Sequence, residues 1–113
     1  LSIYEDGAIV RDFVYIFDVV DAFQRLVELE MVPGRIIDIG SADAATILDV
    51  AEMMIEALEL PKDRFQITGQ FRPGDVRHAV ADISEAEDIL RWQAKVGLRE
   101  GINELVVWAR ANQ

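Results

Sequence analysis

Two arginines, Arg11 and Arg72, lie at positions where the local backbone can fix the orientation of the side chain, as a binding site requires. Arg11 precedes a β-prone run, and Arg72 is followed directly by Pro73 and Gly74, which constrain the backbone to a turn. A guanidinium group stays charged at physiological pH and binds phosphate oxygens through two parallel hydrogen bonds. Arg11 and Arg72, called the arginine clamp below, therefore predict an anion site, although pairing with one of the many carboxylates remains an alternative.

The other reactive side chains form no recognisable catalytic group. His78 is the only histidine and the chain contains no cysteine, so the sequence indicates neither a multi-histidine metal site nor thiolate chemistry. Most carboxylates fall on predicted helix faces, where solvation is their ordinary role. Neither a P-loop nor a Gly-x-Gly-x-x-Gly motif occurs. We therefore expect no catalytic residue, no metal and no cofactor held by this chain.

Length and charge limit the classes of protein to consider. The 113 residues suffice for one domain, and their net charge of -10 argues against broad electrostatic binding to nucleic acid or to an anionic membrane. No apolar run approaches the roughly 20 residues needed to cross a bilayer, and the start of the sequence does not resemble a secretory leader. With no cysteine present, we expect a cytoplasmic protein. Apolar residues nevertheless make up 51% of the chain, which is rich for a domain of this size.

The arginines must be positioned by an α/β fold, because strand-like runs alternate with amphipathic helices. The first two β-prone runs are expected to pair across a turn at residues 5–7. Apolar residues at helical spacing predict four helices, which begin near residues 18, 46, 84 and 98. The predicted strands are residues 1–4, 12–16, 35–39 and 65–68. We expect one small sheet of three or four short strands covered by the amphipathic helices.

Local signals set the expected boundaries of these elements. Asp18 is a plausible N-cap for the first helix, and Pro33 ends it. Thr46 followed by Asp49 has the spacing of a capping box for the second helix. Residues 69–78 are polar and irregular, which predicts a loop that carries the second arginine of the clamp.

Several blocks of the sequence occur in a fixed order and cover nearly the whole chain. They are residues 1–7, 11–16, 18–20, 37–41, 46–50, 71–78 (Phe-Arg-Pro-Gly-Asp-Val-Arg-His), 81–84, 92–96, 98 and 100–102. In this order they resemble the C-terminal part of the extended short-chain dehydrogenase/reductase family. That family comprises NAD-dependent nucleotide-sugar epimerases and dehydratases.

The resemblance implies roles for five residues. Arg11 and Arg72 resemble the two arginines that hold the diphosphate of the nucleotide sugar, which agrees with the arginine clamp. Asp75 resembles a carboxylate near the nucleotide ribose, where an ionised acid accepts hydrogen bonds from two hydroxyls. Ser2 and Tyr4 fall on the strand whose backbone meets the base, so the identity of their side chains should matter less.

The resemblance also implies what this chain does not contain. In that family the nucleotide sugar lies between an N-terminal NAD-binding Rossmann domain and a smaller part, which residues 1–113 resemble. The family's Tyr-x-x-x-Lys pair is absent, because Val19 follows Tyr15 at the lysine position and Ala8 follows Tyr4. We therefore expect a substrate-binding portion that is not catalytic alone, with NAD bound only in the intact enzyme.

Three positions depart from the family pattern where glycine is frequent. Glu5 lies in the first turn, Ala42 follows Gly40-Ser41, and Arg91 follows a helix end. A non-glycine residue at positive φ would cost about 1 kcal/mol at such a position. These departures leave open the nucleotide and the reaction, whether epimerisation, dehydration or decarboxylation.

Two alternatives from other classes stay open on the sequence alone. One is a free-standing small nucleotide-binding or protein-interaction domain without enzyme activity. The other is a structural dimerising domain, which the apolar helices motivate. If the chain is part of an enzyme, some of its apolar surface faces the missing Rossmann domain. The isolated chain should then expose a large apolar patch or bury it by self-association.

Overall fold

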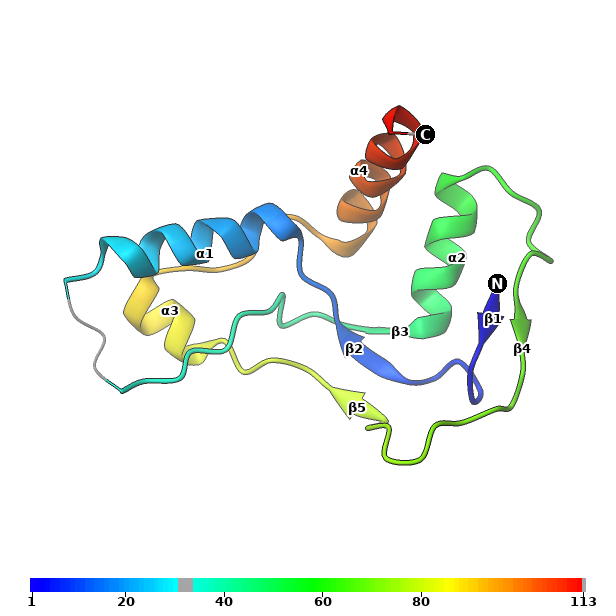
Figure 1. Cartoon of the computed structure of the whole chain (residues 1–113), viewed down its shortest axis with the longest axis horizontal. Helices are drawn as coiled ribbons and strands as arrows, with labels where there is room; N and C mark the ends of the chain where they lie inside the picture. Colours follow the sequence, from blue (N-terminus) through cyan, green and yellow to red (C-terminus); the bar gives the residue numbers. More distant parts are fainter. Residues whose placement is uncertain (31–33, 113) are drawn as a thin grey trace.

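The chain is long and thin in the computed structural model, which describes residues 1–30 and 34–112 (Figure 1). Its extents are 51 × 36 × 20 Å and its radius of gyration is 16.6 Å, whereas a compact domain of about this length has about 13 Å. At one end helix α1 (Ile16–Glu28) packs on α3 (Ser84–Leu90). Towards the other end α2 (Ile47–Ala57) packs beside α4 (Leu98–Ala111).

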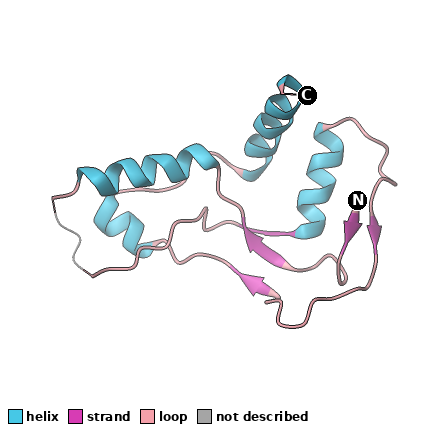
Figure 2. Cartoon of the chain, viewed as in Figure 1, coloured by secondary structure: helices cyan, strands magenta, loops and turns pink. Residues whose placement is uncertain are grey.

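Two small sheets connect the helical ends (Figure 2). Strand β1 (Ser2–Ile3) pairs in parallel with β4 (Gln66–Ile67). Strand β2 (Val10–Asp12) lies between antiparallel β3 (Ala44–Thr46) and parallel β5 (His78–Ala79). The predicted α/β class is confirmed. The predicted pairing of the first two strands is wrong, because β1 and β2 belong to different sheets and each pairs with distant segments.

The strand expected at residues 12–16 ends at Asp12, and helix α1 begins earlier than predicted. The backbone carbonyl of Tyr15 accepts hydrogen bonds from the N–H groups of Asp18 and Val19, so Tyr15 is the N-cap residue. Asp18 is therefore not the cap. Its buried carboxylate instead accepts hydrogen bonds from the backbone N–H groups of Lys95 and Val96, at 3.0 and 2.9 Å. Residues 13–15 form no strand and lead into α1, so their β propensity does not decide their structure.

Residues 35–39, predicted as a strand, have no regular secondary structure and join neither sheet. Ile37 and Ile39 still alternate inward and pack against the apolar core. The predicted buried strand is therefore wrong, because Ile36 is 87% exposed and the segment that pairs with β2 is β3, which was not predicted. Helix α1 ends at Glu28, and Pro33, the predicted end signal, lies outside the described residues.

The capping box of α2 is confirmed. The N–H of Asp49 donates to Thr46 Oγ1 at 3.0 Å, and the N–H of Thr46 donates to Asp49 Oδ2 at 2.9 Å. The Thr46 hydroxyl and backbone bonds lower the pKa of the Asp49 carboxyl. The helices that start at Ser84 and Leu98 and the strand within residues 65–68 also agree with the prediction.

Three positions that depart from a family glycine adopt left-handed backbone conformations. Glu5, Ala42 and Arg91 have φ values of 51°, 57° and 51°. The backbone of each residue makes a hydrogen bond to a residue that is distant in the sequence. Glu5 N–H donates to Gln70 O, Ala42 N–H donates to the Asp12 carboxylate, and Arg91 O accepts from the Arg25 side chain. Tertiary contacts thus compensate for the missing glycines.

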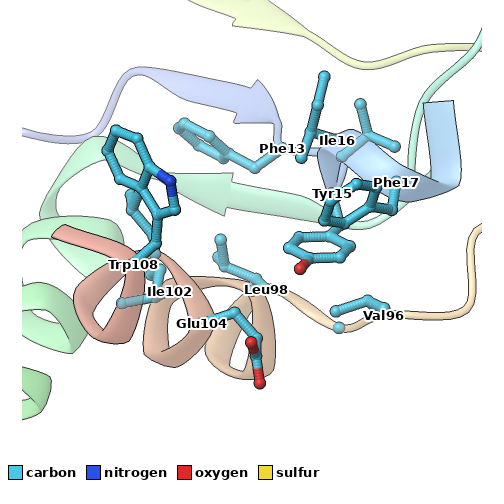
Figure 3. A pocket seen from close by; sticks show the side chains of 13 residues that line it. Phe13, Tyr15, Ile16, Phe17, Val96, Leu98, Ile102, Glu104 and Trp108 are labelled. Atoms are coloured by element: carbon cyan, nitrogen blue, oxygen red, sulfur yellow. The ribbon is translucent and has the colours of Figure 1, made fainter. Parts of the chain in front are cut away.

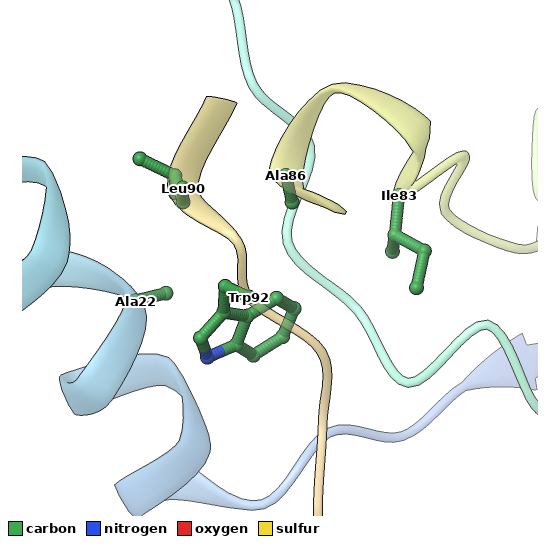
Figure 4. Packing of buried hydrophobic residues seen from close by; sticks show 5 residues of the cluster. All are labelled: Ala22, Ile83, Ala86, Leu90 and Trp92. Atoms are coloured by element: carbon green, nitrogen blue, oxygen red, sulfur yellow. The ribbon is translucent and has the colours of Figure 1, made fainter. Parts of the chain in front are cut away.

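The best-packed apolar cluster lies between α1 and α3 (Figure 4). Its centre is Trp92, which is only 1% exposed, and its other buried members are Ala22, Ile83, Ala86 and Leu90. The indole N–H of Trp92 donates to the backbone oxygen of Asp18 at 3.0 Å. This bond satisfies the one polar atom that the side chain brings into the core.

On the outer face of α1, in contrast, apolar side chains are exposed to solvent. Ile16, Val20, Phe23 and Val27, spaced at helical intervals, are 62%, 41%, 61% and 82% exposed. We call these four residues the α1 stripe. The exposed apolar surface expected from the composition is therefore present on this helix.

Replacing Trp92 by alanine should lower the free energy of unfolding by about 3–5 kcal/mol, because it leaves a cavity in the cluster. The measurement is urea unfolding followed by circular dichroism. Trp108→Ala is the matched control, since Trp108 is 63% exposed, and it should cost about 1 kcal/mol or less. Equal losses for the two variants would contradict the assignment of Trp92 as the centre of the core.

Candidate functional site

Arg11, on the central strand of the three-stranded sheet, forms an ion pair with Asp75, which lies in the loop between β4 and β5. Arg11 Nη2 lies 2.9 Å from Asp75 Oδ1, and the two side chains are 27% and 36% exposed. Arg11 Nη1 donates to the backbone oxygen of Val10 at 2.8 Å, which anchors the guanidinium to its own strand. The pair is thus half-buried but accessible from solvent, and each group keeps hydrogen-bonding capacity for a ligand.

Arg72 lies in the loop that carries Asp75 and stacks on an aromatic ring. Its guanidinium carbon is 5.0 Å from the centre of the Tyr4 ring, within the range of a cation–π contact. The N–H of Asp75 donates to the Arg72 carbonyl at 3.1 Å. This closes the turn predicted at residues 73–74, in which Gly74 has a φ of 87°.

Four of the five predicted site residues are therefore brought together by direct contacts. Arg11 meets Asp75, Arg72 meets Tyr4, and one turn joins Arg72 to Asp75. Ser2 lies on β1 opposite Gln66. In the described part of the chain the Ser2 side chain makes no hydrogen bond to the other four. The alternative of carboxylate pairing holds for Arg11, and its partner is the site residue Asp75.

Arg77 anchors the same loop, a role that the sequence analysis missed. Its guanidinium nitrogens lie 2.7 Å from Glu5 Oε2 and 2.5 Å from Asp6 Oδ2. Its carbonyl accepts from the N–H of Val10. The hydrogen bond from Arg77 holds the pKa of the Asp6 carboxyl below its ordinary value. The only signal in the sequence was the acidic pair in the first turn, about seventy residues away.

Asp12 is a second residue that the sequence analysis missed. Its carboxylate accepts hydrogen bonds from the Ser41 N–H at 2.7 Å, the Ser41 hydroxyl at 2.6 Å, the Ala42 N–H at 3.1 Å and the Ala81 N–H at 3.2 Å. Partial burial acts to raise the pKa of Asp12, but the bonds from Ser41, Ala81 and Ala42 outweigh it and lower the pKa. The carboxylate is therefore ionised at neutral pH.

An apolar groove of about 550 Å³ lies between the start of α1 and helix α4. Figure 3 shows Tyr15 and Phe17 on one side and Leu98, Ile102 and Trp108 on the other. The rings of Tyr15 and Phe17 meet edge to face at 5.6 Å. The residues that line the groove do not include Arg11, Arg72 or Asp75, so the groove and the charged site are separate features.

No group of three or more potential metal ligands occurs among residues 1–30 and 34–112. The single histidine, His78, lies exposed on β5. Within the same residues, no helix combines the length and the apolar character that crossing a lipid bilayer requires.

The sequence matches a known family over most of its length. The family described as GDP-mannose 4,6 dehydratase matches residues 2–105. A dTDP-L-rhamnose 4-epimerase from Burkholderia thailandensis is 42% identical over 108 residues, which are 96% of this chain and 29% of the relative. UDP-glucuronic acid decarboxylase 6 from Arabidopsis thaliana is 32% identical over 102 residues, which are 90% of this chain and 29% of that relative. The chain thus spans less than a third of either relative.

Solved structures agree with these relatives. MoeE5 in complex with UDP-glucuronic acid and NAD superposes with a TM-score of 0.91 at 31% identity, over 100% of this chain and 37% of that chain. UDP-glucuronic acid 4-epimerase from Bacillus cereus, in complex with UDP-glucuronic acid and NAD, gives a TM-score of 0.90 at 27% identity. That match covers 100% of this chain and 36% of the other.

The lowered pKa of Asp12 predicts a pH-dependent contribution to stability. A carboxyl group with a depressed folded-state pKa stabilises the fold above its unfolded value, which is about 3.8, and this contribution is lost as the pH falls through the folded value. The difference in free energy of unfolding between the unmodified chain and Asp12→Asn should therefore be constant from pH 7 to 5 and shrink below about pH 4. Urea unfolding across this range measures it.

Asp88→Asn is the matched control for this experiment, because Asp88 lies exposed on α3. It should differ little from the unmodified chain at every pH. A difference for Asp12→Asn that does not change with pH would contradict an ionised, hydrogen-bonded Asp12.

Proposed function

Because the chain belongs to the GDP-mannose 4,6 dehydratase family of NAD-dependent nucleotide-sugar epimerases and dehydratases, we propose that residues 1–113 are the substrate-binding portion of such an enzyme. The ligand is a nucleoside diphosphate sugar. The observation that carries the proposal is the cluster of Arg11, Arg72 and Asp75, joined by one ion pair and one turn.

The two arginines supply the charge that the ligand needs. A diphosphate carries negative charge, and the net charge of -10 opposes its approach. Arg11 projects from β2, while Arg72 projects from the loop between β4 and β5. The two guanidinium groups therefore come from different elements and can bind the diphosphate from two directions. Stacking on Tyr4 restricts the Arg72 side chain before the ligand arrives.

Asp75 has two functions in this proposal. Without ligand, it neutralises Arg11 at 2.9 Å. With ligand, it accepts hydrogen bonds from the ribose hydroxyls while the phosphate oxygens take its place on Arg11. Ser2 and Tyr4 lie on and just after β1, and the backbone of this segment meets the base. Two solved structures of MoeE5 are complexes with UDP-glucuronic acid and with UDP-glucose, which supports a ligand of this class.

The chemical step requires groups outside these residues. The sequence contains no Gly-rich phosphate loop and no Tyr-x-x-x-Lys pair, so these residues do not fit NAD. When bound, NAD exchanges a hydride with the sugar. Residues 1–113 bind and orient the nucleotide, and the NAD-binding Rossmann domain belongs to a part of the enzyme outside them.

The α1 stripe is the proposed contact surface for that other part. Its four apolar residues face solvent on a helix whose opposite side is already packed against α3. The relatives extend over about three times the length of this chain. Burying the stripe against the rest of the enzyme removes an apolar surface that a monomer rarely leaves exposed.

Replacing either clamp arginine should weaken nucleotide binding in the full-length enzyme. We expect Arg11→Ala and Arg72→Ala each to cost about 1.5–3 kcal/mol in the binding of UDP or dTDP, as loss of a charged hydrogen-bonding partner does. Isothermal titration calorimetry provides the measurement. Arg110→Ala is the matched control, because Arg110 lies exposed in the last turn of α4. Unchanged affinity in both clamp variants would exclude the arginine clamp.

The same titration with residues 1–113 alone separates the enzyme part from a free-standing binding module. We expect weak or undetectable binding of UDP by the isolated chain, because part of the site lies elsewhere. Binding as tight as in the full-length enzyme would instead favour the module.

The isolated chain should self-associate through the α1 stripe as its concentration rises. Sedimentation velocity over a concentration series should show this, and Phe23→Glu should shift the chain towards monomer, because the charge is costly to bury. Ile36→Glu is the matched control, since Ile36 is 87% exposed outside the stripe. If the unmodified chain stays monomeric at every concentration, self-association through the α1 stripe is excluded.

A further inference from the structure

The carboxylate of Asp12 accepts hydrogen bonds from segments on both sides of β2, the strand that carries Arg11. On the β3 side it accepts from the Ser41 N–H and hydroxyl and from the Ala42 N–H. On the β5 side it accepts from the Ala81 N–H. One side chain therefore joins β2 to the segment that leads into β3 and to the segment that leaves β5.

The ladders around β2 are too short to hold the strand firmly by themselves. Strand β3 offers three paired residues and β5 only two. Arg11 pairs with Ala45 on one side and with Ala79 on the other, and the β5 ladder ends at that position. Beyond Arg11, the connection between β2 and the β5 segment passes through the Asp12 carboxylate.

The chain fits closely around this carboxylate. A Cβ atom on Gly40 would overlap Asp12 Oδ2 and the Ala81 methyl group. Gly40 can therefore lie this close to Asp12 only because it has no side chain. Ala42 adopts a φ of 57°, although it is not glycine, and its N–H is held by Asp12 at 3.1 Å. A strained backbone persists only where its surroundings hold it in place.

Successive residues of a strand point to opposite faces, so Arg11 and Asp12 project to opposite sides of β2. The Asp12 carboxylate fixes the strand from one face, and the Arg11 guanidinium meets Asp75 on the other. We propose that Asp12 is a positioning residue for Arg11, which it holds in the orientation that receives the diphosphate. This inference rests on the proposed function, because the diphosphate is the ligand that Arg11 is proposed to bind.

Asp12→Asn tests the inference with little change in shape. The asparagine oxygen can still accept from Ser41, but its NH₂ group would face the N–H donors of Ala42 and Ala81. At least two of the four bonds are therefore lost with the charge. We expect the dissociation constant of the full-length enzyme for UDP to rise by about tenfold.

A double-mutant cycle with Arg11→Ala separates positioning from a general loss of structure. If Asp12 acts through Arg11, Asp12→Asn should change the affinity of the Arg11→Ala enzyme for UDP by about threefold or less. An equal loss in both backgrounds would show a merely structural role and overturn the inference. Thermal unfolding by circular dichroism verifies that each variant is folded at the temperature of the titration.

The outcomes also distinguish this inference from the proposed function. If Arg11→Ala weakens UDP binding and Asp12→Asn does not, Asp12 is not a positioning residue and the clamp stands. If Arg11→Ala binds UDP like the unmodified enzyme, Arg11 takes no part in the clamp and the inference is wrong as well. Should Asp12→Asn fail to fold, Ser41→Ala removes one of the four donors and should shift affinity in the same direction. Asp88→Asn, exposed on α3, is the matched charge control and should bind UDP normally.

Discussion

The hydrogen bonds to Asp12 are the constraint on which the middle of this fold depends. The strands are only two or three residues long, so backbone ladders alone provide few bonds between distant segments. The Asp12 carboxylate adds four bonds to segments 29 and 69 residues away in the sequence. These bonds depend on two unusual positions. No side chain fits at residue 40, which is glycine, and Ala42 adopts a left-handed backbone conformation. The proposed ligand site includes Arg11, which lies on the strand held in this way.

Features encoded by neighbouring residues could be predicted from the sequence. The Thr46–Asp49 capping box, the helices after residues 84 and 98 and the Pro73-Gly74 turn depend on side chains within a few residues of each other. Strands β3 and β5 could not be predicted in this way. Alanine, which supplies much of both, has little β propensity, and their pairing is decided by β2, more than thirty residues away.

The site shows the same division between local and distant information. The residue types and the turn identified Arg72 as a directed cation, and the family resemblance added Asp75 and Tyr4. That Asp75 would pair with Arg11, and that Tyr4 would support Arg72, are contacts over 64 and 68 residues of sequence. Asp12 and Arg77 were missed because their partners are also distant in the sequence, by 29 to 69 residues for Asp12 and by 71 and 72 for Arg77. The arginine clamp therefore stays a prediction from residue types and the family resemblance, and the residues that hold its scaffold could not be predicted from the sequence.

The thin shape separates two packing centres, and this affects local unfolding of the chain. Trp92 and its neighbours form one packing centre between α1 and α3, while Ala51, Ile55, Ile102 and Val106 are buried where α2 meets α4. Among residues 1–30 and 34–112, short strands and loop segments connect these two centres, so each end can lose its protection against amide hydrogen exchange without the other. Arg11 and Asp12 lie on the connection between them. A nucleotide held at that point would therefore make the two ends unfold as one cooperative unit.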